Sequence, residues 1–157
     1  MDAGCFYYLR DQYFIDFPDD GLMQNKEYED KQLHNRPCFF AFRDKKNGLL
    51  WLIPISSKVS KYRAVYERTI ARYGKCHTIV FGEVLGHEKA FLIQNMAPAT
   101  EDYIDKQYLD SATLCPVRID GRTEREIIKK ARKVLEMERH GVKLLFPDVF
   151  EIEKKLL

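Results

Sequence analysis

Two apolar runs dominate the hydrophobic pattern of this chain, at residues 37–42 and 49–55. Neither run alternates apolar and polar positions, which predicts two strands buried on both faces near the centre of a sheet. The segment between them ends in Asn47-Gly48. Both residue types tolerate a positive φ, so the pair predicts a turn that joins the two strands as an antiparallel hairpin.

Shorter segments of the chain also fit strands, because they are rich in aromatic or apolar residues and are bounded by turn residues. These segments are residues 6–9, 13–17, 78–84, 90–93 and 116–119. Residues 22–35 are polar and lack periodicity, which predicts a long loop. Loops of this length in compact domains often carry function.

Helical spacing is clearest at residues 60–73, where apolar side chains recur every three or four positions. Gly74 follows directly and supplies a stop for this helix. Residues 98–109 predict a second, short helix, with Thr100 as its N-cap.

Two further helices are predicted toward the C-terminus. Thr123 and Glu126 have the spacing of a capping box, in which hydroxyl and carboxylate satisfy each other's backbone donors. The positions that follow keep helical spacing up to Gly141. Pro147 then opens a last helix that runs to Leu157, because proline is favoured in the first turn.

The predicted elements are segregated along the chain rather than alternating, which indicates an α+β fold with an antiparallel sheet. We expect a compact, twisted sheet or partly open barrel with three or four helices, in one domain over residues 1–157. No apolar window of about 18 residues exists, and no basic segment precedes an apolar run at the N-terminus. Neither a transmembrane helix nor a secretory signal is therefore expected.

The net charge of +2 conceals a strong asymmetry. Residues 1–30 carry eight acidic residues against two basic ones, whereas residues 58–75 carry six basic residues against one acidic one. A local field of this kind attracts a polyanion such as RNA, although a solvated helix face would have the same composition. The candidate RNA-binding residues are Lys61, Arg63, Arg68, Arg72 and Lys75, with Lys129, Lys130 and Lys133 on the later helix as a second candidate surface.

The four cysteines are widely spaced and form no CxxC pair, so they predict reduced thiols in a cytoplasmic protein rather than a zinc site. Sequence motifs for metal-dependent hydrolysis or for a phosphate-binding glycine loop are also missing. We therefore expect no metal and no cofactor.

Five polar residues flank the central hairpin: His34, Arg36, Ser56, Ser57 and Lys58. The end of one strand and the start of its antiparallel partner lie at the same edge of the sheet, so the hairpin brings them together. Metal-free RNA cleavage needs groups that move the 2′-hydroxyl proton, neutralise the phosphate and protonate the leaving 5′-oxygen. Hydroxyls, Arg, Lys and His meet these needs.

Each of these residues also has a structural explanation. Ser57 could cap the following helix, Arg36 could pair with an acid of the N-terminal segment, and His34 could be an exposed loop residue. The remaining histidines are isolated in the sequence and are assigned no role; they are His77, His87 and His140.

At the same residues the chain resembles the type III toxin–antitoxin endoribonucleases of the ToxN/AbiQ family, most closely the CptN branch. The resemblance rests on Arg36-Pro37, on the hairpin, and on the stretch Pro54-Ile55-Ser56-Ser57-Lys58. It implies a twisted antiparallel sheet akin to the MazF, CcdB and Kid toxins, and metal-independent cleavage of cellular RNA that leaves a 2′,3′-cyclic phosphate. It also implies a cytoplasmic toxin acting in plasmid maintenance or abortive infection.

The resemblance further assigns partners and roles. Ser57 matches the catalytic serine of the family, Ser56 the preceding hydroxyl, and Arg36 an active-site lysine. In our hypothesis of an endoribonuclease, Arg36 and Lys58 neutralise the charge on the phosphate, and His34 is the candidate for proton transfer. A small structured antitoxin RNA would inhibit the toxin by direct binding, in a closed toxin–RNA assembly. The alternatives are a non-catalytic RNA-binding module and a protein-interaction domain.

Overall fold

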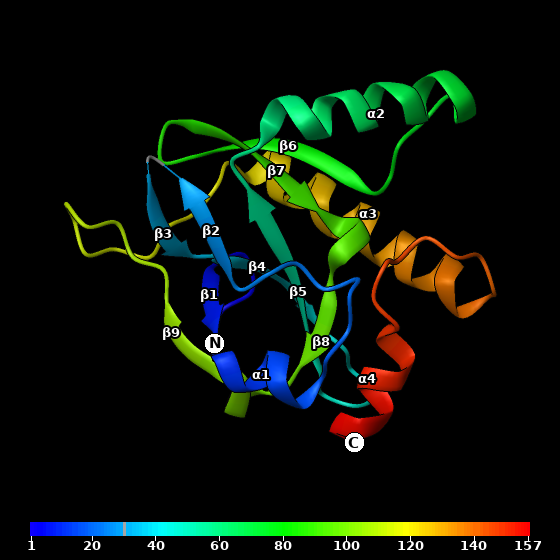
Figure 1. The fold of residues 1–157 in the computed structure, drawn as a ribbon, viewed down its shortest axis with the longest axis horizontal. Coiled ribbons are helices and arrows are strands. Elements are labelled where there is room, and N and C mark those ends of the chain that lie inside the picture. The colour runs from blue at the N-terminus through cyan, green and yellow to red at the C-terminus, as the bar shows by residue number, and fades with distance from the viewer. Residues whose placement is uncertain (30) are drawn as a thin grey trace.

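A computed structural model describes residues 1–29 and 31–157. Across these residues, seven strands form one antiparallel sheet (Figure 1). Its order is β6-β7-β5-β4-β1-β9, and β8 also pairs with β5. The strands are β1 (Phe6–Leu9), β4 (Cys38–Arg43), β5 (Leu50–Ser56), β6 (Ile79–Val84), β7 (His87–Leu92), β8 (Ala97–Ala99) and β9 (Ile104–Gln107).

The predicted central hairpin is β4 and β5, which pair antiparallel with Cys38 opposite Pro54. Every residue of β5 is buried, as is every residue of β4 except Arg43. Both faces of this hairpin are covered by other elements, which explains why its sequence does not alternate.

Four α-helices occur in the described residues: α1 (Asp11–Asp16), α2 (Val59–Tyr73), α3 (Gly121–Arg139) and α4 (Val149–Leu156). Helix α3 packs on one face of the sheet, where Ile127 and Val134 join Phe39 and Trp51 in the largest apolar cluster. Helices α1 and α4 contribute to a second cluster on the other face.

Helix α2 packs against β6 and β7 on the same face as α1 and α4, through the buried Tyr62. It confirms the helix predicted at residues 60–73, and Gly74 ends it in a left-handed conformation with φ of 78°. Tyr73 by contrast is 64% exposed, so the tyrosines of this helix are only partly core residues.

The strand predicted at residues 13–17 is wrong, because this segment belongs to helix α1 and its C-cap. Tyr13 and Phe17 are four positions apart and enter the core together, which is the spacing of one helix face. The Tyr13 hydroxyl donates a 2.7 Å hydrogen bond to the carbonyl of Pro98, which fixes the helix against β8.

The long loop predicted at residues 22–35 is also wrong. The segment contains a two-stranded antiparallel sheet of β2 (Lys26–Glu29) and β3 (Gln32–Asn35), and Asp30 lies outside the described residues. The residues of β3 are all exposed, so this strand has no buried face. Its sequence therefore lacks the alternation of apolar and polar residues by which strands are recognised.

The helix predicted at residues 98–109 is replaced by β8, a 3₁₀ turn at Glu101–Tyr103, and β9. Pairing with the neighbouring strands decides this outcome, since β8 completes one side of β5 and β9 forms the edge beside β1. Residues 116–119 form no strand in the described chain, where only an isolated bridge joins Leu109 to Pro116.

The two C-terminal helices are confirmed, but the capping of α3 differs from the prediction. Asp120 is the N-cap, and its carboxylate accepts a hydrogen bond of 3.0 Å from the amide of Thr123. The helix therefore begins before the predicted capping box. Asp148 caps α4 through the amide of Glu151.

The α+β class and the antiparallel sheet are thus confirmed, and over the described residues the sheet stays open between its edge strands β6 and β9. None of the helices seen in the described residues combines the length and apolar character needed to cross a bilayer.

Candidate active site

Glu27 lies at the centre of the polar cluster beside the central hairpin. Its Oε1 atom accepts hydrogen bonds from the Ser57 hydroxyl at 2.7 Å, the Ser57 amide at 3.0 Å and the Ser56 hydroxyl at 3.2 Å. Strand β2 therefore places the Glu27 carboxylate at the end of β5. These bonds orient the two serines before any ligand binds.

Arg36 holds the other oxygen of this carboxylate. Its Nη1 atom lies 3.3 Å from Glu27 Oε2 and donates to the Ile55 carbonyl at 2.7 Å, and its Nε atom donates to the Gln24 carbonyl at 2.9 Å. The residue is only 7% exposed. Most of its side chain is therefore enclosed by the protein, although Arg36 also lines a small pocket with Ser56 and Lys58.

The alternative that Arg36 pairs with an acid of the N-terminal segment is confirmed. The alternative that Ser57 caps the following helix is wrong: the N-cap of α2 is Lys58, whose side chain makes no capping bond, and the Ser57 hydroxyl bonds Glu27 instead. Ser57 is held just after the end of β5 by its hydrogen bonds to Glu27, which is itself paired with Arg36.

The Glu27 carboxylate stays ionised in this setting. Burial by itself raises its pKa, but the bonds from the Ser57 hydroxyl and amide, the charge of Arg36 and the bond from Ser56 outweigh burial and lower the pKa overall. An ionised carboxylate has no proton to donate, so in this hydrogen bond the Ser57 hydroxyl is the donor and Glu27 is the acceptor. The lone pairs of the Ser57 oxygen are therefore directed away from Glu27 and can accept a hydrogen bond from a ligand.

A pocket of about 360 Å³ opens beside Ser57. Its polar wall includes Glu27 and His34, which lie directly opposite each other in the β2–β3 pair. His87 and Lys89 of β7 line the same pocket. Two imidazoles, a primary amine, a hydroxyl and a carboxylate therefore surround one cavity.

Two tyrosines add an aromatic wall to this pocket, Tyr8 and Tyr108. Their rings meet edge to face with centroids 5.7 Å apart. Burial and the neighbouring Tyr108 raise the pKa of Tyr8 to about 12, so its hydroxyl stays protonated at neutral pH. Such a surface suits contact with a nucleobase.

Ser56 and Lys58 line a different pocket. Ser56 is the last residue of β5 and Ser57 follows it; the two serines line different pockets although both hydroxyls bond Oε1 of Glu27. The second pocket, of about 220 Å³, is lined by Ser56 and Lys58 together with Lys61 and Tyr62 from the start of α2. The structure thus brings His34 and Ser57 to one pocket and Lys58 to another.

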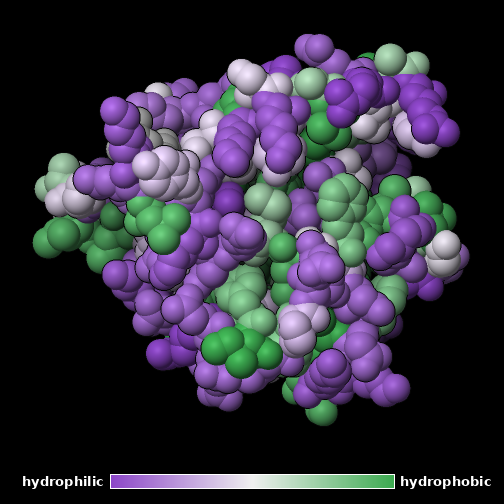
Figure 2. Space-filling model, in the orientation of Figure 1, coloured by the Kyte–Doolittle hydropathy of each residue, from purple (hydrophilic) through white to green (hydrophobic). Residues whose placement is uncertain are grey.

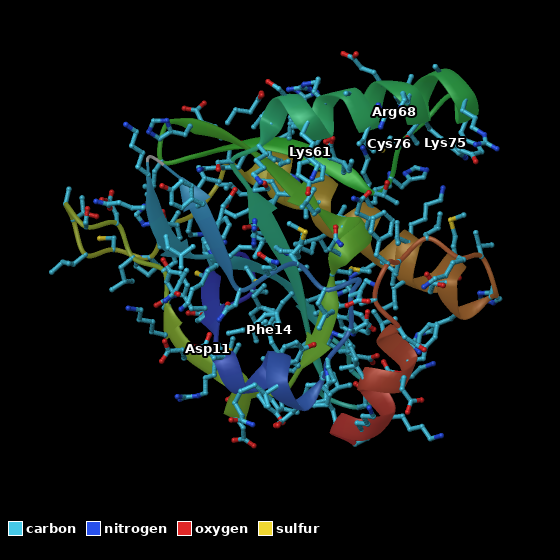
Figure 3. The ribbon with its side chains drawn as sticks, in the orientation of Figure 1. Asp11, Phe14, Lys61, Arg68, Lys75 and Cys76 are labelled. Atoms are coloured by element: carbon cyan, nitrogen blue, oxygen red, sulfur yellow. The ribbon has the colours of Figure 1, made fainter. Side chains whose placement is uncertain are left out.

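The basic residues predicted on α2 follow the length of the helix. Figure 3 shows Lys61 near its start, Arg68 farther along, and Lys75 beyond its end. This face of the molecule is mainly hydrophilic, including the region over α2 (Figure 2). Arg63 differs from the others, because it stacks on Phe81 at 3.7 Å and pairs with Glu88 at 2.8 Å.

The two predicted basic surfaces approach each other at His77. Burial lowers the pKa of His77, and the charges of Lys133, Lys75 and Lys130 lower it further. Within the described chain, neither ring nitrogen of His77 has a hydrogen-bond partner. Lys75, which follows α2, and two lysines of α3 therefore act on one residue.

Sequence reasoning missed Glu27 and His87. Eight acidic residues occur in residues 1–30, and only the pairing of β2 with β3 selects one of them. The available signal was the position of Arg36, directly before a strand predicted to be buried on both faces, because a buried guanidinium requires a partner. In residues 1–29 and 31–157, no group of three or more His, Cys, Asp or Glu side chains is arranged to hold a metal ion.

No sequence-family model and no curated protein matches the chain. Among solved structures, its fold matches that of a toxin of the type III toxin–antitoxin class. That toxin is AbiQ, a lactococcal anti-phage endoribonuclease belonging to the type III toxin–antitoxin system. The match covers 99% of this chain and 96% of AbiQ, with a TM-score of 0.65 and 17% sequence identity. The predicted resemblance is confirmed at the level of the fold.

Proposed function

We propose that this protein is a metal-independent endoribonuclease toxin of a type III toxin–antitoxin system. One observation carries the proposal: Ser57 is held by Glu27 at the mouth of a pocket that also contains His34. The likeness to AbiQ in fold supports the same activity. The reaction is attack of the substrate's own 2′-hydroxyl on the adjacent phosphorus, which leaves a 2′,3′-cyclic phosphate.

In this proposal Ser57 positions the nucleophile. A serine is a poor base at its normal pKa, and the adjacent Glu27 carboxylate disfavours the alkoxide. The Ser57 oxygen instead accepts a hydrogen bond from the 2′-hydroxyl, while His34 takes part in proton transfer. Arg36 acts as a positioning residue, because it holds the carboxylate that orients Ser57.

Lys58 and Lys61 are assigned to the RNA backbone rather than to the reacting phosphate. They line the pocket that contains Ser56 rather than the pocket beside Ser57, and a neighbouring phosphate of the same RNA strand can bind there. The remaining basic residues of α2 and α3 extend this surface toward a larger RNA.

The proposed inhibitor is a small structured antitoxin RNA that binds the toxin directly in a closed toxin–RNA assembly. Its contacts are the basic residues of α2 and α3 described above. The proposal includes a cytoplasmic location, for which the four free cysteines are suited, and a single toxin domain over residues 1–157.

The test is expression in cells that lack the antitoxin RNA. Wild-type protein should arrest growth, and Ser57→Ala should not. Ser60→Ala is the matched control, because Ser60 is an exposed serine three positions away in the first turn of α2. Full arrest by Ser57→Ala at equal protein levels would remove Ser57 from the mechanism.

The second candidate is an RNA-binding module without catalysis. The basic residues along α2 favour it, since Lys61, Arg68 and Lys75 follow the length of the helix (Figure 3) and none of them lines the pocket beside Ser57. Binding of RNA by the purified protein, with the RNA recovered intact, would support this candidate over the endoribonuclease.

A further inference from the structure

We infer that His87 is the general acid of the proposed cleavage and gives its proton to the leaving 5′-oxygen. The inference rests on the proposed function and deepens it. Cleavage by a 2′-hydroxyl needs two proton transfers, one from the nucleophile and one to the leaving group. Sequence reasoning supplied one imidazole, His34, and the pocket holds a second.

The pairing of β5 with β7 places His87 relative to Ser57. Ile55 lies opposite Phe91 and Ser56 opposite Ala90, with the two strands antiparallel. This pairing ends at Ser56 and Ala90. Ser57 follows Ser56 and Lys89 precedes Ala90, so the two residues leave the same end of the strand pair, and both line the pocket. His87 follows two residues farther along β7 on the same face, a rise of about 7 Å.

This order matches the order of atoms in the reaction. In an in-line displacement the 2′-oxygen and the 5′-oxygen stand on opposite sides of the phosphorus. Ser57 stands on the nucleophile side, Lys89 contributes positive charge beside the phosphate, and His87 stands on the leaving-group side. All three line the same pocket, as the shared face requires.

His34 then belongs to the nucleophile side. It lies directly opposite Glu27 in the β2–β3 pair, and Glu27 holds Ser57. The other titratable groups of the pocket are poorly suited to protonate the leaving oxygen. Glu27 is ionised and already accepts four hydrogen bonds, three at Oε1 and one from Arg36 at Oε2, and the hydroxyl of Tyr8 is a weak acid because of its raised pKa.

The bond from O2′ to phosphorus forms while the bond from phosphorus to O5′ breaks. The 2′-hydroxyl proton passes to neutral His34, and protonated His87 gives a proton to O5′. The products are a 2′,3′-cyclic phosphate and a free 5′-hydroxyl, and water restores the protonation of both histidines.

The test compares two forms of one RNA substrate, chosen at a site that the wild-type protein cleaves. One carries the ordinary 5′-oxygen, and in the other sulfur replaces that oxygen. A thiolate leaves without being protonated, so the second substrate does not need the general acid. His87→Ala and His87→Asn should cleave the oxygen substrate about 100-fold more slowly than wild type, yet cleave the sulfur substrate within a few-fold of wild type.

Two controls define the outcome. His34→Ala should be slow on both substrates, and His140→Ala should match wild type on both, because His140 lies at the end of α3. Equal slowing of both substrates by the His87 variants, or no slowing of either, would overturn the inference and leave the proposed function standing. Failure of the wild-type protein to cleave any RNA would instead overturn the proposed function.

Discussion

Arg36 and Glu27 form a buried ion pair, with 3.3 Å between Nη1 and Oε2 and side chains that are 8% and 10% exposed. The pair joins three segments, since Arg36 also bonds the carbonyls of Gln24 and Ile55. Glu27 in turn bonds Ser57. The position of the serine thus depends on a residue thirty positions earlier in the chain.

Replacing Glu27 by glutamine should destabilise the fold. The substitution keeps the size of the side chain but leaves the Arg36 charge without its counter-ion, which costs about 3 kcal/mol in buried pairs. Urea unfolding of Glu27→Gln measures this loss in the free energy of unfolding. Glu67→Gln, on the exposed surface of α2, is the control and should unfold like wild type.

The same carboxylate should make stability depend on acid pH. The pKa of Glu27 is lowered in the folded protein, so below its ordinary value of 4.5 the unfolded chain binds the proton more readily. The stabilisation from Glu27 is therefore complete above that pH and is lost as the pH falls through the folded pKa. The difference in unfolding free energy between wild type and Glu27→Gln should shrink as the pH falls below 4.5; a constant difference would contradict an ionised Glu27.

The two adjacent serines should behave differently. Ser57 lines the pocket with His34, whereas Ser56 lines the pocket with Lys58. Ser57→Ala should reduce the rate of RNA cleavage by about 100-fold or more, and Ser56→Ala by much less, while each loses about 1 kcal/mol of stability. Single-turnover cleavage and urea unfolding of both variants separate the two effects. Equal rate losses would assign both hydroxyls to the reaction.

Neutralising the basic surface of α2 should weaken RNA binding. Each lost phosphate contact lowers the salt dependence of the binding constant, with a slope of about 0.7 per contact for single strands. Titration with a long single-stranded RNA in the Ser57→Ala background, at several salt concentrations, measures this slope. The variant carries Lys61→Gln, Arg68→Gln and Arg72→Gln.

Two comparison variants locate the RNA surface. Lys154→Gln with Lys155→Gln on α4 should bind like the parent protein. A triple variant of Lys129, Lys130 and Lys133 tests the α3 surface, and because Lys75, Lys130 and Lys133 all act on His77, we expect it to weaken binding too. An unchanged slope in both triple variants would move the RNA interface elsewhere.

The candidate site divides into a part that the sequence predicts and a part that it does not. Arg36 and Ser57 come together through a hairpin whose turn and strands are local, so their proximity follows from neighbouring residues. Glu27 sits in an exposed hairpin that lacks hydrophobic alternation. His87 comes to the pocket beside Ser57 through the pairing of β5 with β7, which joins distant segments that no local pattern specifies.

The fold divides in a similar way. Helix α2 carries its own periodicity and its own stop at Gly74, and its prediction is correct. Residues 13–17 and 98–109 were assigned wrongly because their conformation depends on tertiary contacts, namely the packing of Tyr13 in the core and the pairing of Leu50 with Ala99.

The central claim is tested most directly by the ends of the RNA fragments that the purified protein makes in the presence of a chelator. We predict that a long RNA incubated with wild-type protein in EDTA yields discrete fragments with 2′,3′-cyclic phosphate and 5′-hydroxyl ends, and that Ser57→Ala yields none. Mass spectrometry of the fragments identifies the ends. Intact RNA, loss of cleavage in EDTA, or fragments with 3′-hydroxyl ends would contradict the account.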